Sequence, residues 1–393
     1  MERRPLIIVG SGPAGTASAL FLQRHASVLA RDALILEKAH HPRPKVCAGG
    51  LIPHTLQCLR ELDVPLSVAN VGVHRVGVDV PGRSITYEDG ELCRVVRRDA
   101  FDHSLVVACR ERGIEVREDE KVLGLQRDGD GVRIDTERMS YHARVVIGAD
   151  GSGSAVRRQL VADGRQCVGK AVMADVPVAA VDWSGFARSR YDFSFTAVAD
   201  GLRGYVWAFP CLIDGTPHVN VGVYSVDANG TGPELMRLLH AQLDRMGAPP
   251  VPVKSFPIRW YGKGVRIAGS RVLLAGDAAG VDPLMGEGIS FAFEYGRRAA
   301  AAVMRAWATG DCSFADYERE VATSWMGKKL RRLGLAVRLF YGPAWRLCFP
   351  LAARSRHAQT IAVRWYNGVG GLDQRSDWDV CSAWLCGRLP STR

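Results

Sequence analysis

The sequence predicts an α/β fold, with a Rossmann-like domain, a second domain built on a mostly antiparallel β-sheet, and a C-terminal helical region. An apolar run at 6–9 leads into a glycine-rich turn, a helical stretch from Pro13 to about Arg24, and a second apolar run at 33–36. This order is the strand–turn–helix–strand unit of a Rossmann fold. Residues 71–95 instead alternate polar and apolar side chains, as strands with one buried face do, and residues 165–265 also read as mostly strands.

The turn at residues 10–15 has the spacing of a dinucleotide-binding loop. Gly10 permits the tight turn, Gly12 lets the backbone approach a pyrophosphate, and Gly15 lets the helix pack closely against the strand. The N-terminus of that helix presents free N–H groups and partial positive charge to phosphates. Glu37 ends the second strand, where an acid accepts hydrogen bonds from ribose hydroxyls. The alternative is a turn without a ligand, and the position of Glu37 favours the nucleotide site.

Two later turns place a carboxylate at the end of an apolar run of strand type. They contain Asp150 and Gly151 in one case and Gly276 and Asp277 in the other. A carboxylate there can bond a ribityl hydroxyl, and the glycine leaves room for the ligand. Residues 286–289 then open a long helical stretch, whose N-terminal amides favour negative charge on a pyrophosphate or a reduced flavin. The three turns together predict tightly bound FAD.

In their order, these turns resemble the FAD-binding fold of para-hydroxybenzoate hydroxylase and its relatives. Residues 98–102, Arg-Asp-Ala-Phe-Asp, are similar to a fourth signature of that fold, in which an arginine at a helix start reaches the cofactor. Two segments resemble the geranylgeranyl reductase family within it: Pro-Lys-Val-Cys-Ala-Gly-Gly-Leu at 44–51 and Tyr-Val-Trp-Ala-Phe-Pro at 205–210. Ala48 departs from the Cys-Gly-Gly-Gly that the family more often has. The resemblance covers roughly residues 5–310.

The resemblance implies a discontinuous domain organisation and a set of site residues. We expect an FAD-binding domain at 1–70, 97–160 and 266–310, a substrate-binding sheet at 71–96 and 161–265, and a helical region at 311–393. The predicted cofactor-binding residues are Gly10, Gly12, Pro13, Ala14, Gly15, Glu37, Lys38, Lys45, Cys47, Ala48, Gly49, Arg98, Val122, Asp150, Gly151, Gly276, Asp277, Pro283, Gly286, Gly288 and Ile289. The predicted substrate-lining residues are Tyr205, Trp207, Phe209 and Pro210. No metal site is predicted.

The activity that the resemblance implies is FAD-dependent reduction of carbon–carbon double bonds in an isoprenoid or similar apolar lipid. Tyr205, Trp207 and Phe209 alternate along one strand and so share a face, which suits a substrate on which positive charge develops. Ordinary sheet core is the alternative for these rings. Cys47 is the catalytic candidate, because the pKa of a thiol is readily moved by its surroundings, with Lys45 nearby in sequence. Its alternative role is that of a small apolar filler.

Two rival functions stay open at this stage. A flavin monooxygenase or halogenase has the same cofactor fold, and a membrane-docked protein could bind FAD or lipid without turnover. No second glycine-rich strand–turn–helix unit occurs, so electrons are expected from transiently bound NAD(P)H or from a reduced ferredoxin-type protein. Glu287 is expected to cap its helix, and His40, His41 and His54 to be surface or loop histidines.

A strongly basic segment lies toward the end of the chain. Residues 324–366 contain nine lysines and arginines and no acid, while the net charge of the whole chain is +10. The segment is rich in Leu, Trp, Phe and Tyr, and Pro343 and Pro350 are expected to break its helices. It is typical of a membrane-surface element that attracts anionic lipid, and a solvated helical cap is the equal alternative. No nucleic-acid-binding signature accompanies the charge, so nucleic acid is not an expected partner.

Composition is that of a globular protein with room for more than one domain. Hydrophobic residues make up 47% of the 393 residues, and no apolar run reaches the ~18 residues that a membrane-spanning helix needs. The first strand begins too close to Met1 for a removable signal peptide. The ten cysteines, Cys381 and Cys386 included, lack the pairing of a metal site. We therefore expect a cytoplasmic protein with reduced thiols that can associate with a membrane.

Overall fold

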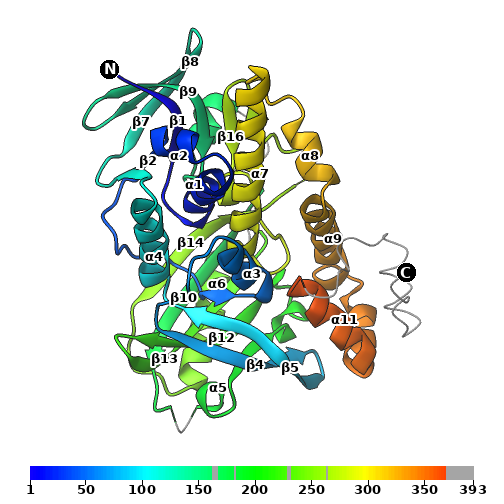
Figure 1. The fold of residues 1–393 in the computed structure, drawn as a ribbon. Helices are drawn as coiled ribbons and strands as arrows, with labels where there is room; N and C mark the ends of the chain where they lie inside the picture. Colours follow the sequence, from blue (N-terminus) through cyan, green and yellow to red (C-terminus); the bar gives the residue numbers. More distant parts are fainter. Residues whose placement is uncertain (162–166, 181–182, 228–231, 263, 369–393) are drawn as a thin grey trace.

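The computed structural model describes residues 1–161, 167–180, 183–227, 232–262 and 264–368. Two eight-stranded sheets form its centre, and helices cover the first sheet and one side of the molecule (Figure 1). The first sheet has the order β15-β16-β9-β1-β2-β6, and the β7–β8 hairpin extends it from β9. Its strands are β1 (Glu2–Val9), β2 (Leu34–Leu36), β6 (Glu115–Arg117), β7 (Val122–Asp128), β8 (Gly131–Thr136), β9 (Ser140–Gly148), β15 (Ala268–Gly269) and β16 (Val272–Leu274).

The register of the first sheet brings the three predicted turns to one edge. β1, β9 and β16 are parallel, and Val9 is paired with Gly148, which is in turn paired with Leu274. These are the last residues of the three strands, and each is followed directly by one of the glycine-containing turns. The carboxyl edge of a parallel sheet is where ligands bind in such folds. Sequence segments more than a hundred residues apart therefore meet because their strands end in register.

Helices pack closely against this sheet because small residues stand at the contacts. A Cβ on Gly15 would lie 1.9 Å from the Gly10 carbonyl oxygen, and one on Gly296 would lie 2.7 Å from Ala17 Cβ. The first contact sets α1 against the turn, and the second sets α1 against α7. The helices of this part are α1 (Pro13–His25), α2 (Ser27–Asp32), α3 (Pro53–Glu61), α4 (Arg98–Glu111) and α7 (Ile289–Thr309), with short turns at η1 (Arg157–Val161) and η3 (Gly276–Ala278).

The second sheet has the order β14-β10-β13-β12-β11-β4-β5-β3, and all its pairings are antiparallel except that of β11 with β4. One face packs on α6 through valines and leucines, and the other face carries the aromatic residues. Its elements are β3 (Gly50–Leu51), β4 (Asn70–Val80), β5 (Arg83–Val96), β10 (Val168–Pro177), α5 (Ser184–Ala187), β11 (Arg190–Ser194), η2 (Thr196–Val198), β12 (Gly204–Ile213), β13 (Thr216–Ser225), α6 (Gly232–Arg245) and β14 (Val253–Arg259). The predicted fold class is confirmed. β3 joins this sheet although residues 1–70 were assigned to the cofactor domain.

The C-terminal helices bridge the two halves of the molecule. They are α8 (Tyr317–Thr323), α9 (Trp325–Phe340), α10 (Trp345–Arg354) and α11 (Arg356–Tyr366). Leu330 of α9 belongs to the core of the first sheet, whereas Val337 of the same helix belongs to the aromatic core of the second. In Figure 1 these helices run along one side of the molecule, past both sheets. Within the described residues, no helix combines the length and apolar character needed to cross a bilayer.

One expectation for this region is wrong. Pro343 does separate two helices, but α10 continues through Pro350. Phe349 and Ala353 of α10 are buried in the aromatic core, and this packing outweighs the loss of one backbone hydrogen bond at the proline. The end of the predicted helical region, with Cys381 and Cys386, lies outside the described residues.

Candidate active site

A cavity of about 730 Å³ extends from the first glycine-rich turn to the aromatic face of the second sheet. Its wall contains most of the residues predicted from the sequence. These are Gly10, Gly12, Pro13, Ala14, Glu37, Lys38, Lys45, Cys47, Ala48, Gly49, Arg98, Val122, Asp150, Gly151, Tyr205, Trp207, Phe209, Gly276, Asp277, Gly286, Gly288 and Ile289. The structure thus gathers residues from all three turns, the cysteine loop and β12 around one space.

Three predicted residues lie outside this wall. Gly15 sits under the Gly10 carbonyl, where it sets the helix against the turn. Pro283 is buried, and its carbonyl oxygen accepts a hydrogen bond of 3.0 Å from the Tyr224 hydroxyl. Pro210 alternates with Phe209 and belongs to the opposite face of β12. Contact of these three residues with a ligand stays a prediction. In the structure they lie behind the cavity wall, next to residues that line it.

The first turn is held by a buried network around Glu37. Gly10 has φ +100°, and a Cβ there would lie 2.5 Å from a backbone carbonyl oxygen, so only glycine fits. Glu37 Oε2 accepts hydrogen bonds from Ser11 N (3.0 Å) and Ser11 Oγ (2.8 Å), and Oε1 accepts one from Ala39 N (3.1 Å). Since a carboxylate has about four acceptor positions, one remains for a ligand hydroxyl. His41 Nε2 lies 2.7 Å from Ser11 Oγ and completes the network.

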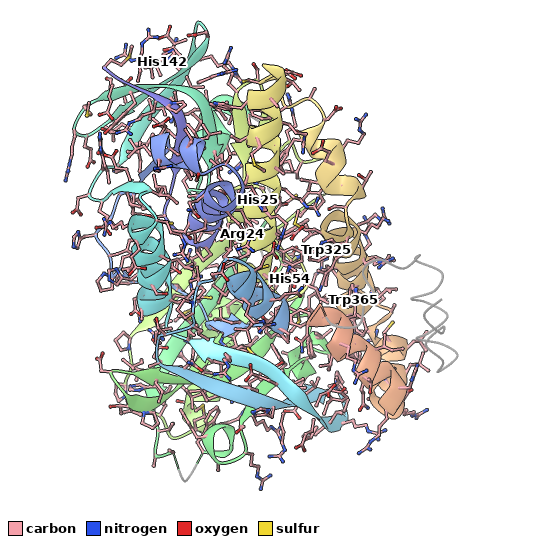
Figure 2. The ribbon with its side chains drawn as sticks, viewed as in Figure 1. Arg24, His25, His54, His142, Trp325 and Trp365 are labelled. Atoms are coloured by element: carbon pink, nitrogen blue, oxygen red, sulfur yellow. The ribbon has the colours of Figure 1, made fainter. Side chains whose placement is uncertain are left out.

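His40 and His41 lie in a loop, whereas His54 lies on a helix and is largely buried, so the histidine expectation is wrong at one position. His40 is exposed, but His41 is buried, and burial is the first cause that lowers its pKa. His54 lies on α3, where its ring makes an edge contact with Trp325 of α9, with centroids 4.9 Å apart (Figure 2). Burial lowers the pKa of His54 to about 4, so this residue is neutral and joins the C-terminal helices to the cofactor domain.

The helix start beside the first turn is open toward the cavity. Gly12 is the N-cap of α1 and offers no side-chain cap, so the first N–H groups of the helix have no side-chain partner there. Arg43 Nη2 would be 3.6 Å from a Cβ on Gly12, and its guanidinium also lies 3.5 Å from Glu37 and from Asp102. The combination of free amides, helix dipole and a guanidinium suits a pyrophosphate. Arg43 was not among the predicted ligands, although it lies only two residues from Lys45.

The second and third turns meet through their polar side chains. Asp150 Oδ2 accepts hydrogen bonds from the Ala155 and Val156 amides (2.7 and 3.2 Å), whereas Oδ1 is buried without a partner among the described residues. Burial raises the pKa of Asp150. Ser152 Oγ donates to Asp277 Oδ2 at 3.1 Å. An unpartnered carboxylate oxygen in a cavity wall fits a ligand hydroxyl, so the residues present fit FAD.

The cysteine loop lies against the charged part of the cavity. The Gly49 amide donates to Cys47 Sγ at 3.4 Å, and the Arg98 guanidinium is close enough to interact with the thiol. Arg98 itself makes a bidentate pair with Asp102, at 2.7 and 2.9 Å. Lys45 Nζ lies 3.3 Å from the centroid of the Phe256 ring. Burial lowers the pKa of Lys45 to about 8, against the opposing effect of Asp277.

The aromatic wall is a packed cluster whose polar atoms point away from it. Ring centroids of Phe193 and Phe209 are 5.3 Å apart, and those of Tyr205 and Trp207 are 5.9 Å apart. Trp207 Nε1 donates to Asn220 Oδ1 at 2.7 Å. The hydroxyl of Tyr205 donates to the Met285 carbonyl at 2.5 Å. Because these two polar groups already have partners within the protein, neither needs a hydrogen bond from a ligand.

Several residues of the cavity wall were not predicted from the sequence, and one of them comes from the C-terminal helices. Tyr366, the last residue of α11, lines the cavity, although its segment carries no recognisable motif. Burial and the charges of Asp282 and Glu287 raise its pKa. Lys329 Nζ holds this helix end by donating to the carbonyls of Trp365 (2.8 Å) and Tyr366 (3.0 Å). Glu287 accepts from Ser290 N at 2.8 Å, which confirms its predicted capping role.

Comparison with known proteins decides the family. The model of the FAD binding domain family matches residues 3–309. The chain belongs to this FAD-binding family. Among its curated relatives, the menaquinone reductase of Mycobacterium tuberculosis (strain ATCC 25618 / H37Rv) is 28% identical over 97% of this chain and 95% of its own length. A digeranylgeranylglycerophospholipid reductase of Methanosarcina acetivorans is 29% identical over 81% of this chain and 80% of its own.

Two solved structures that are less than 25% identical to this chain share its fold. A geranylgeranyl bacteriochlorophyll reductase-like protein of Thermoplasma acidophilum has a TM-score of 0.72 at 23% identity, covering 87% of this chain and 88% of that one. A flavin-dependent brominase has a TM-score of 0.72 at 20% identity, with 93% and 94% covered. The predicted resemblance is therefore confirmed, and the chain is an FAD-dependent oxidoreductase by family. Because reductases and halogenases share this fold, fold alone does not select the reaction.

Proposed function

We propose that this protein is an FAD-dependent reductase that saturates carbon–carbon double bonds in an isoprenoid chain. The observation that carries the proposal is the wall of Tyr205, Trp207 and Phe209, which faces the same cavity as the FAD-fitting turns and Cys47. Relatives named menaquinone reductase and digeranylgeranylglycerophospholipid reductase support a prenyl lipid as substrate. NAD(P)H or a reduced ferredoxin-type protein would deliver the electrons.

In this proposal, different residues of the cavity bind FAD, orient the substrate and supply the proton. Asp150, Asp277 and the amides of α1 would bind FAD, which when bound and reduced supplies a hydride. The rings of Tyr205 and Trp207 orient the apolar chain, exclude water and stabilise positive charge on the alkene carbons. Cys47 holds a proton at Sγ, beside Arg98, for delivery to the second alkene carbon. Lys45, which lies near Asp277, would contribute positive charge to the cavity and so favour the negative charge of a reduced flavin.

The test separates the three candidate functions. Purified protein with reduced flavin is given a menaquinone or a digeranylgeranyl lipid under strict anoxia, and the products are analysed by mass spectrometry. Gain of two hydrogens per double bond is the expected result. Product that forms only when oxygen is admitted would instead support a monooxygenase, or a halogenase if halide is incorporated. Flavin whose reoxidation does not respond to any lipid would indicate a binding protein without turnover.

The same proposal includes contact with a membrane surface through residues 324–366. A prenyl lipid resides in a bilayer, and this segment supplies nine basic residues without an acid. Contact of this kind would keep the enzyme near its substrate.

A further inference from the structure

The outer surface of α9 and α10 carries apolar residues where a soluble helix normally carries polar ones. Of the five leucines that stand exposed in the described part of the chain, four lie on these two helices: Leu335 (55% exposed), Leu339 (40%), Leu347 (69%) and Leu351 (55%). Each helix contributes a pair spaced four residues apart, so the members of a pair lie on one face. We call these four residues the leucine patch.

The patch is separate from the helix faces that pack on the core. On α9, the buried Leu333 and Val337 are each two residues from a patch leucine, which places them roughly 200° around the helix. On α10 the buried Phe349 and Ala353 stand in the same relation to the other pair. Both helices are therefore apolar on two opposite sides. One side is explained by the aromatic core, and the other has no packing role within the described residues.

The charge around the patch indicates what covers it. Exposed arginines accompany the leucines on both helices and at the start of α11, at Arg338, Arg346, Arg354 and Arg356. Arg346 also lies over the ring of Trp345, with its guanidinium carbon 5.0 Å from the centroid. A second copy would bring these arginines against one another, because a two-fold contact joins like surfaces. An anionic surface meets the same charges favourably.

We propose that the leucine patch and its arginines dock this protein on the surface of an anionic lipid bilayer, with the four leucines inserted among the lipid chains. This deepens the membrane contact that belongs to the proposed function and rests on it. Ring contacts link the patch helix to the cavity wall: Phe349 of α10 is 5.4 Å from Phe195, which is 5.7 Å from Tyr205. The rings of Phe349 and Phe195 thus connect the helix that carries the patch to Tyr205 in the cavity wall.

Vesicle co-sedimentation of the FAD-loaded full chain tests the docking. We expect binding to vesicles of phosphatidylcholine with phosphatidylglycerol, weaker binding to phosphatidylcholine alone, and a loss of binding at high salt. The double variant Leu347→Gln, Leu351→Gln should bind at least about tenfold more weakly, since two apolar side chains no longer leave water. Leu123→Gln is the matched control, because Leu123 is 53% exposed on β7, far from the patch in sequence and fold, and it should bind as the wild type does.

Two kinds of result, from sedimentation and from light scattering, would overturn the docking proposal. One is wild-type protein that stays in the supernatant with anionic vesicles, or a double variant that sediments with them undiminished. The other is a dimer in solution that the double variant dissociates, measured by light scattering, since the patch would then be a self-interface. Turnover of a detergent-dispersed prenyl lipid should be the same in both variants and the wild type. If none of the three proteins turns over this lipid while the wild type still binds vesicles, the proposed reductase activity is contradicted and the docking proposal is not.

Discussion

The ammonium group of Lys329 lies 2.8 Å from the carbonyl oxygen of Trp365 and so ties α9 to the last turn of α11. The final carbonyls of a helix have no partner within the helix, and a buried cation satisfies them while matching the negative end of the dipole. Figure 2 shows Trp365 on the same side of the molecule as Trp325, which packs on His54. The consequence is that the next residue, Tyr366, is held in the cavity wall.

Removal of the Tyr366 ring should change how substrate is held. We expect Tyr366→Ala to lower kcat/KM roughly tenfold, mainly through KM, and to alter which double bonds are reduced, since the ring is part of the cavity wall. Tyr366→Phe should keep near wild-type values. Lys329→Met should also lower kcat/KM, because Tyr366 loses its anchor, and Lys329→Arg should restore part of the loss. Product analysis on a polyprenyl substrate measures this, and a phenylalanine variant as impaired as the alanine one would show that the hydroxyl is what matters.

Loss of the Asp277 carboxylate should release the cofactor. Asp277→Ala removes an acceptor that joins the third turn to Ser152 and faces the cavity. A hydrogen bond to a charged group contributes roughly 1.5–3 kcal/mol, so FAD affinity should fall roughly tenfold to a hundredfold. Fluorescence titration of flavin-stripped protein gives the value. Asp200→Ala, at an exposed turn, should bind FAD normally, and wild-type affinity in Asp277→Ala would contradict the assignment of the third turn.

Substitution of Cys47 should separate cofactor binding from turnover. Cys47→Ser keeps the size of the side chain but donates a proton far less readily, so yellow, FAD-loaded protein with at least about tenfold lower kcat is expected. Cys348→Ser, a half-buried cysteine on α10, serves as the control. Unchanged rate and product pattern in Cys47→Ser would leave the thiol with a packing role only.

The buried Lys45 should leave a signature in the pH dependence of stability. Its pKa is about 8 in the folded protein against 10.5 ordinarily, so between these values the unfolded chain binds more protons. Stability therefore rises with pH across this window, and below pH 8 the cost of the buried charge is fully present. In flavin-stripped protein, Lys45→Met should be more stable than wild type below pH 8, by urea denaturation. The difference should shrink as pH rises toward 10.5, and a constant difference would place Lys45 in solvent.

Local patterns were enough to predict that the three turns lie together, because each turn follows the end of a strand. The turns at Gly10, Asp150 and Gly276 each come directly after an apolar run, and the parallel pairing then aligns them. The alternation at 205–210 likewise placed three rings on one face, with Pro210 on the other. A period of two and the spacing of glycines are local properties of the sequence. These local properties were sufficient to predict the turns and the shared face of the three rings.

Features that depend on tertiary packing could not be read in the same way. Tyr366 lines the cavity because Lys329 and the aromatic core position α11, and no local pattern encodes that contact. Pro350 is accommodated within a helix because Phe349 is buried beside it. His41 is buried by a network that includes Ser11, thirty positions earlier in the chain. The leucine patch was also hidden in the sequence, since exposure is set by which side of α9 meets the core.

β1, β9 and β16 end in register, so the turns proposed to hold FAD come from residues spread over nearly three-quarters of the chain. By this proposal the cofactor site is complete only after residues as late as Gly288 have been synthesised, and separation of the third turn from the first should release the FAD. The flavin absorbance of a preparation should therefore report the fraction of molecules in which these distant parts of the chain have folded together.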